Sequence, residues 1–255
     1  MKKHIVCLGD SNTHGYCADP SDCAEGGIRF NESERWTCLL QTALGENYLV
    51  AEEGLNGRTT VFPDPIEEGK AAIDYIYPCL KTHQDVDLLI IMLGTNDAKE
   101  RFSVNAFNIA AGMDRLVKKA MDTECWGGRK PNILVISPPA ILEGVENGPL
   151  RGTMGLGSVE KSRQLAAEYR LICEARGIHF LDCWDPHTGR TRRLHATYVR
   201  YRGEIYTRMH LHLPVEHAIF LISRTNTKRA ERIAARFDLL QDVTNEINMM
   251  ERSKQ

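Results

Sequence analysis

The stretch Ile5-Val6-Cys7-Leu8-Gly9-Asp10-Ser11-Asn12-Thr13 decides the fold class that we predict for this chain. Its first five residues are apolar or small, as in a buried strand, and the polar residues that follow predict a turn. A strand that ends there places the Ser11 hydroxyl at the carboxyl edge of a sheet, where open α/β folds bind ligands. The stretch therefore predicts an α/β protein with a functional group at the end of its first strand.

Apolar runs and helical periodicities alternate along the chain, which predicts a three-layer α/β/α sandwich around a central parallel five-stranded sheet. The run Leu88–Met92 is apolar on both faces, as a central parallel strand must be. We expect strands at His4–Leu8, Tyr48–Ala51, Asp87–Met92, Asn132–Ser137 and Ile178–Leu181. We expect helices at Arg35–Leu44, at Val104–Met121 with Ser103 as N-cap, and at Val159–Arg176 with Gly177 beyond its end.

Length and charge limit the classes of function. With 255 residues, 42% of them apolar, the chain can bury one sizeable core, and its net charge of −2 gives no reason to expect nucleic acid or an anionic membrane as partner. No apolar run approaches the roughly 18 residues of a membrane-spanning helix. The apolar run near the N-terminus is also too short for the apolar region of a secretory signal. We therefore expect a soluble, cytoplasmic protein without a membrane span. Whether it forms a homo-oligomer stays open.

The eight cysteines are scattered, and no two are spaced as a CxxC pair. Zinc ligation needs clustered spacings, so we expect no metal site and no cofactor. Cys7, Cys38 and Cys173 lie within apolar patterns and are expected to be reduced core residues. Cys17 and Cys23 fall in a polar loop, where we expect no disulfide in a reducing compartment.

Two later segments, Gly54–Thr60 and Gly94–Asp97, contain groups that could place hydrogen-bond donors around the Ser11 hydroxyl. Taken alone, Gly9-Asp10-Ser11 favours an ordinary turn, because these residue types are common after any strand. It is not a GxSxG elbow, because position 13 is Thr, and no Gly-Lys-Ser/Thr follows as in a phosphate loop. A serine flanked by two donor segments, however, is typical of an acyl-transfer site.

The three segments together resemble the SGNH hydrolases, also called the GDSL esterase/lipase family, and in particular their arylesterase and acyltransferase branch. The matching blocks are Cys7–Tyr16, Glu52–Thr60 and Ile90–Asp97, and weaker similarity extends the resemblance over residues 4–183. The resemblance implies that Ser11 is the nucleophile and that its own amide is the first oxyanion donor. It implies a backbone N–H of Gly57 and the side-chain amide of Asn96 as further donors. Asp97 is expected to be a turn or network residue.

The resemblance also implies a domain organisation, with an SGNH hydrolase core over residues 1–183. Residues 184–255 form a divergent C-terminal segment that holds 11 of the 21 arginines. We expect this segment to end in an amphipathic helix over Thr227–Val243 and to belong to the same single domain.

The general base is the part of the family pattern that this chain lacks. Members supply it from a C-terminal Asp-x-x-His, but no histidine after Ser11 has an acid three positions earlier. The candidates are His210, with Thr207 at the acid's position, and His195, with Arg192 there; His212 is a less favoured variant. Three explanations stay open: a substitute acid such as Asp185 or Glu204, a Ser–His dyad, or a C-terminal segment that no longer supports catalysis.

The first functional hypothesis is a serine esterase that hydrolyses small acyl esters and can also pass the acyl group to alcohols. The alternative is a catalytically impaired protein of the same fold that binds the ester without turnover. A flavodoxin-like order of strands would also suit a nucleotide or flavin binder, although the first loop lacks the glycine pattern for phosphates. The long loop Asn12–Glu34 is expected to wall the substrate pocket.

Overall fold

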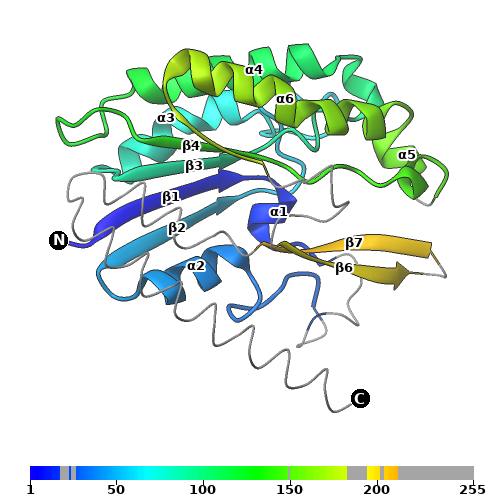
Figure 1. Cartoon of the computed structure of the whole chain (residues 1–255), viewed down its shortest axis with the longest axis horizontal. Helices are drawn as coiled ribbons and strands as arrows, with labels where there is room; N and C mark the ends of the chain where they lie inside the picture. The colour runs from blue at the N-terminus through cyan, green and yellow to red at the C-terminus, as the bar shows by residue number, and fades with distance from the viewer. Residues whose placement is uncertain (18–22, 24–26, 149, 183–193, 202–203, 212–255) are drawn as a thin grey trace, which may run out of the picture. The chain divides into compact units, whose positions relative to one another are not determined.

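The computed structural model describes residues 1–17, 23, 27–148, 150–182, 194–201 and 204–211 (Figure 1). The chain divides into two compact units, residues 1–212 and 213–255, and every described residue belongs to the first. The predicted boundary at residue 183 and the predicted terminal helix Thr227–Val243 lie outside the described residues. The single-domain organisation therefore stays a prediction.

A five-stranded parallel sheet forms the centre of the first unit, as predicted. Its strands are β1 (Lys3–Gly9), β2 (Tyr48–Gly54), β3 (Leu88–Met92), β4 (Ile133–Ser137) and β5 (His179–Asp182). They lie in the order β2-β1-β3-β4-β5 and all neighbouring pairs are parallel. Every residue of β3 and β4 is buried, which explains why both read as continuous apolar runs.

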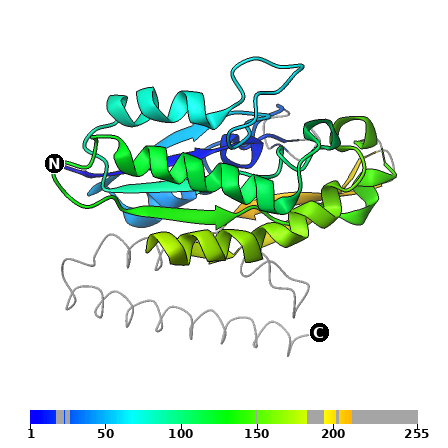
Figure 2. The same ribbon diagram turned by 90° about the horizontal axis from the view of Figure 1, so that it is seen from above.

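Helices cover both faces of this sheet, which confirms the three-layer arrangement. They are α1 (Ser11–His14), α2 (Trp36–Leu44), α3 (Ala72–Thr82), α4 (Ala106–Asp122), α5 (Arg151–Met154) and α6 (Ser158–Arg176), with 3₁₀ turns η2 (Glu100–Phe102) and η3 (Glu143–Glu146). Figure 2 shows α3, α4 and α6 side by side over one face, and α2 packs beside β2 on the other. The main core fills the space between these three helices and the sheet, where Leu8, Leu116 and Tyr169 are almost completely buried.

Two local features of the helices differ from the sequence-based expectation. The α3 helix was not predicted, because Pro78 lies inside it and proline normally ends a helix. The α4 helix begins at Ala106, and its N-cap is Asn105, whose Oδ1 accepts a hydrogen bond from Asn108 N at 2.9 Å. Ser103 instead ends η2 in the left-handed conformation, with φ of 53°. The expected left-handed Gly177 after α6 is confirmed, with φ of 65°.

A hairpin that the sequence analysis did not predict follows the five-stranded sheet. Its strands β6 (Leu194–Tyr201) and β7 (Glu204–Leu211) pair antiparallel over their full lengths. The available signal was the set of β-branched and aromatic residues on both sides of Arg202-Gly203, which the high arginine content obscured.

No disulfide involves the cysteines of the described part of the chain. Cys7 and Cys173 are buried as expected, whereas Cys38 is half-buried. Cys17 and Cys23 were expected in a polar loop, but they are buried in a small cluster with Phe30. The apolar ring of Phe30 explains the difference, because it gives the two thiols a core of their own within the loop.

Among the helices that the structure describes, none combines the length and the apolar character needed to cross a bilayer.

Candidate active site

The ends of β1, β2 and β3 lie level, so the loops that follow them start side by side. Gly9 is the register partner of Gly54 on one side and of Met92 on the other. A Cβ on Gly9 would lie 2.0 Å from Thr13 Oγ1, and one on Gly54 would lie 2.2 Å from His14 N. Glycine at both positions therefore lets the first turn of α1 pack directly against the sheet edge.

Ser11 is the first residue of α1 and is half-buried. Asp10 caps the turn, and its Oδ1 accepts a hydrogen bond from Asn12 N at 2.9 Å. Gly15 ends the turn in the left-handed conformation, and its N–H donates to Ser11 O. The Ser11 N–H and hydroxyl donate to no other described residue, so both are free to meet a ligand at this edge.

A tight turn after β2 holds Gly57 at the same edge. Arg58 N donates to Leu55 O at 3.1 Å, and Leu55 N donates to Gly9 O at 3.1 Å. Gly57 has a φ of 81°, which only glycine adopts easily. Its N–H has no acceptor among the described residues.

Asn96 joins the loop after β3 to the other two. Its side chain is buried, and Nδ2 donates to Arg58 O at 3.0 Å and makes a long contact of 3.5 Å with Asp10 Oδ2. The Arg58 guanidinium in turn donates to Gly9 O at 3.1 Å and to Glu53 O. The three sequence blocks are thus tied to one another by hydrogen bonds, with Ser11, Gly57 and Asn96 at one edge of the sheet. Their catalytic roles stay predictions.

Asp97 is completely buried behind this edge. Its Oδ1 accepts hydrogen bonds from Thr60 N at 2.9 Å and from Thr60 Oγ1 at 2.5 Å. Burial raises the pKa of Asp97 to about 6, although the hydrogen bonds from Thr60 oppose the shift. These contacts fit the network role expected for Asp97, which links the loop after β3 to the residues that follow the Gly57 turn.

Asp10 is the most perturbed acid beside the serine. Burial raises the pKa of Asp10 to about 7; the hydrogen bond from Asn12 N opposes this shift and the charge of Asp97 adds to it. Since the carboxylate form is disfavoured in the native state, ionisation of Asp10 lowers stability as the pH rises from about 4 through about 7.

The Asp10→Asn variant is therefore expected to be more stable than the wild type at pH 8, with the difference shrinking as the pH falls toward 4. Asparagine keeps the acceptor for Asn12 N but carries no charge. A shift from 3.8 to about 7 limits the gain to about 4 kcal/mol. Urea unfolding at a series of pH values measures it, and a difference that is independent of pH would contradict the burial of a charged form.

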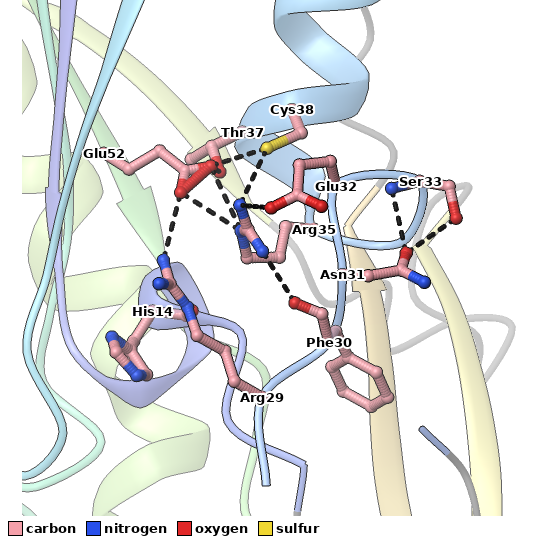
Figure 3. A network of polar contacts seen from close by, with 10 residues as sticks. All are labelled: His14, Arg29, Phe30, Asn31, Glu32, Ser33, Arg35, Thr37, Cys38 and Glu52. Carbon is pink, nitrogen blue, oxygen red and sulfur yellow. Dashed lines mark hydrogen bonds and ion pairs between the residues drawn. The ribbon is translucent and has the colours of Figure 1, made fainter. Parts of the chain in front are cut away.

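A network around Glu52 anchors the end of the long loop before α2 (Figure 3). Glu52 Oε2 lies 3.1 Å from Arg35 Nε and 3.2 Å from Arg29 Nη2. Burial raises the pKa of Glu52, but hydrogen bonds from Cys38, Thr37 and Arg35 outweigh it, so the pKa lies below its ordinary value. Arg29 Nε also donates to His14 O at 2.8 Å. The network thereby holds this loop against α1, while its role as a pocket wall stays a prediction.

One group of described residues has the residue types and spacing that could hold a metal ion. It consists of Glu53, Cys79 and His83, whose possible ligand atoms all lie within 4.8 Å of one another. No sequence pattern marks the group, because Glu53 lies far from Cys79 and His83 in the chain. His83 Nε2 lies 2.6 Å from Glu53 Oε1, and Tyr75 OH donates to Glu53 Oε2 at 2.7 Å. Both carboxylate oxygens are thus occupied, so we interpret the group as a network that joins β2 to α3.

The two favoured base candidates lie in the hairpin. His195 on β6 and His210 on β7 are direct register partners, although they are 15 positions apart in the sequence. The remaining candidates of the tail, His212 and the acid Asp185, lie outside the described residues, as does Arg192.

Comparison with known proteins shows to which family this chain belongs. The model of the GDSL-like lipase/acylhydrolase family matches residues 7–214. The chain belongs to this family. It is therefore a carboxylic ester hydrolase of the SGNH type, as the three sequence blocks led us to expect. A comparison with curated protein sequences gives no match.

Solved structures of this GDSL-like family include close matches. The native aryl esterase of M. smegmatis is 35% identical over 71% of this chain and 84% of its own, with a TM-score of 0.63. A carbohydrate acetylesterase from Sinorhizobium meliloti is 29% identical over 92% of this chain and 99% of its own, with a TM-score of 0.63. A carbohydrate acetylesterase family member from the same organism is 35% identical over 71% of this chain and 82% of its own, with a TM-score of 0.62.

Proposed function

We propose that this GDSL-like hydrolase uses Ser11 as nucleophile to cleave small acyl esters. The observation that carries the proposal is the arrangement of Ser11, Gly57 and Asn96 on three hydrogen-bonded loops at one sheet edge. Relatives described as an aryl esterase and as carbohydrate acetylesterases favour a short acyl group such as acetyl.

The donors suit an oxyanion hole. The N–H groups of Ser11 and Gly57 have no acceptor among the described residues, so neither must break a bond to accept an oxyanion. Asn96 Nδ2 carries two hydrogens, of which one is committed to Arg58 O at 3.0 Å. The other makes only the long 3.5 Å contact with Asp10 and is available to a stronger acceptor. A neutral amide also stays a donor at every working pH.

The reaction then follows from these positions. Ser11 Oγ attacks the ester carbonyl and loses its proton to a base, while the carbonyl oxygen becomes an oxyanion held by the three donors. The alcohol leaves with the proton from the base, and an acyl group stays on Ser11 Oγ. Water then attacks the acyl-enzyme by the same route, and an alcohol in place of water gives acyl transfer.

The base in this proposal is His210 or His195. The hairpin does not favour one over the other, because pairing of β6 with β7 brings the two histidines to one register position. Glu204 is not a suitable acid for either one. It lies six residues from His210 on the same strand, or about 20 Å at 3.3 Å per residue, and its register partner Tyr201 is equally far from His195. Asp185, a Ser–His dyad, and a C-terminal segment that no longer supports catalysis remain as the explanations.

The nucleophile can be tested by covalent labelling. A fluorophosphonate probe is expected to label the wild type once per chain, and the adduct is expected on Ser11 after digestion and mass spectrometry. The Ser11→Ala variant should show no adduct, whereas Ser33→Ala, which removes an exposed serine, should label normally. A folded wild type that stays unlabelled would favour the impaired, ester-binding alternative.

A further inference from the structure

The Asn56–Gly57 peptide carries the proposed second oxyanion donor, and a lysine from a distant part of the loop holds its carbonyl. Lys70 Nζ donates a hydrogen bond to Asn56 O at 2.8 Å. Asn56 O and Gly57 N–H belong to the same planar peptide unit, in which they point in opposite directions. A group that fixes the direction of the carbonyl therefore also fixes the direction of the Gly57 N–H.

The turn that contains this peptide can adopt two orientations. The hydrogen bond from Arg58 N to Leu55 O at 3.1 Å closes a four-residue turn with Asn56 and Gly57 at its centre. Gly57 has a φ of 81° and Asn56 does not have a positive φ, which together define a type II turn. Type I keeps the same closing bond but has the central peptide rotated by about 180°. Glycine at this position permits both forms, so the turn alone does not fix the N–H.

Lys70 is itself held firmly in place. Thr59 N donates to Lys70 O at 3.0 Å, which anchors the lysine backbone beside the turn. The side chain is only 13% exposed, and Nζ lies 3.0 Å from Glu67 Oε2. It also crosses over Gly57, since a Cβ built on that glycine would lie 3.4 Å from Lys70 Cε and 3.5 Å from Nζ. The ammonium group is thus fixed between a carboxylate and the Asn56 carbonyl.

We propose that Lys70 is a positioning residue of ester hydrolysis, one that holds the Asn56–Gly57 peptide in the orientation that directs the Gly57 N–H at the oxyanion. The inference rests on the proposed function of Ser11 and Gly57. Lys70 acts through the peptide and does not touch the substrate. Its positive charge on the carbonyl oxygen also polarises the amide and makes the N–H a stronger donor, because hydrogen bonds along one chain strengthen one another.

The test compares Lys70→Met with Lys70→Arg in hydrolysis of p-nitrophenyl acetate. Methionine keeps much of the apolar stem and removes the donor, so kcat is expected to fall about 10- to 100-fold, less than the roughly 100- to 1,000-fold cost of losing an oxyanion donor outright. KM is expected to stay unchanged, because the interaction matters in the transition state. Arginine can still donate to Asn56 O and is expected to restore most of kcat.

A second readout reports on the hole directly. Phenylboronic acid forms a tetrahedral adduct with a serine hydroxyl, and its inhibition constant for Lys70→Met should rise by a factor similar to the loss in kcat. The matched control is Lys119→Met, because Lys119 Nζ also donates to a backbone carbonyl, that of Ile73, at 2.6 Å, and Ile73 belongs to α3 rather than to the loops of Ser11, Gly57 and Asn96. The control is expected to keep the kcat of the wild type.

The outcomes separate this inference from the proposed function. If Lys70→Met keeps its kcat while Ser11→Ala is inactive, the role of Lys70 is overturned and the nucleophile stands. A fall in kcat matched by Lys119→Met, or one that Lys70→Arg does not restore, also overturns it. If Ser11→Ala stays active, both proposals are wrong.

Discussion

The Ser11→Ala variant is expected to lose at least about four orders of magnitude in kcat for p-nitrophenyl acetate, as removal of a serine nucleophile does in other hydrolases. The hydroxyl is the atom that forms the acyl-enzyme, and alanine offers no substitute. The oxyanion donors remain, so a residual rate above that in buffer is expected from them alone. Initial rates at saturating substrate measure the loss.

Stability provides the control for this variant. The Ser11 hydroxyl makes no hydrogen bond within the described part of the chain, while the cap of α1 comes from Asp10 Oδ1 and Asn12 N. Ser11→Ala should therefore unfold at the temperature of the wild type. Wild-type rates from a well-folded Ser11→Ala protein would mean that another group carries the reaction.

The second large effect is expected from the histidines of the hairpin. One of the two variants His210→Ala and His195→Ala should lose about four or more orders of magnitude in kcat, since loss of the base costs about as much as loss of the nucleophile. The other should retain most of its activity. The rate of the wild type should rise with pH as the imidazole of the base loses its proton, and the inactive variant should lack this rise.

Each histidine variant is the control of the other. His195 and His210 are register partners in the same two strands, so a general effect on the hairpin should be similar in both variants. A difference in kcat between them therefore identifies the base. If both variants stay fully active, neither histidine of the hairpin is the base, and the other seven of the nine histidines of the chain are the next candidates.

The parts of the fold that were predicted correctly depend on short-range patterns. A continuous apolar run such as Leu88–Met92 reports burial on both faces, and the left-handed Gly177 marks the end of α6. The missed elements are those in which tertiary contacts outweigh a local signal. The α3 helix forms despite Pro78 because Ile76 and Leu80 are completely buried against the core. The missed hairpin forms through pairing between β6 and β7.

The candidate site likewise combines features that a local sequence pattern indicates with features that only tertiary contacts create. The resemblance of three short blocks to the GDSL family singled out Ser11, Gly57 and Asn96 as candidate site residues, because the blocks can be recognised locally in the sequence. Three other properties depend on residues that are distant in sequence and close in space. They are the raised pKa of Asp10, which burial causes, the pairing of His195 with His210, and the hydrogen bond from Lys70 to Asn56. No local pattern encodes them, since burial and register arise when strands, loops and helices pack together.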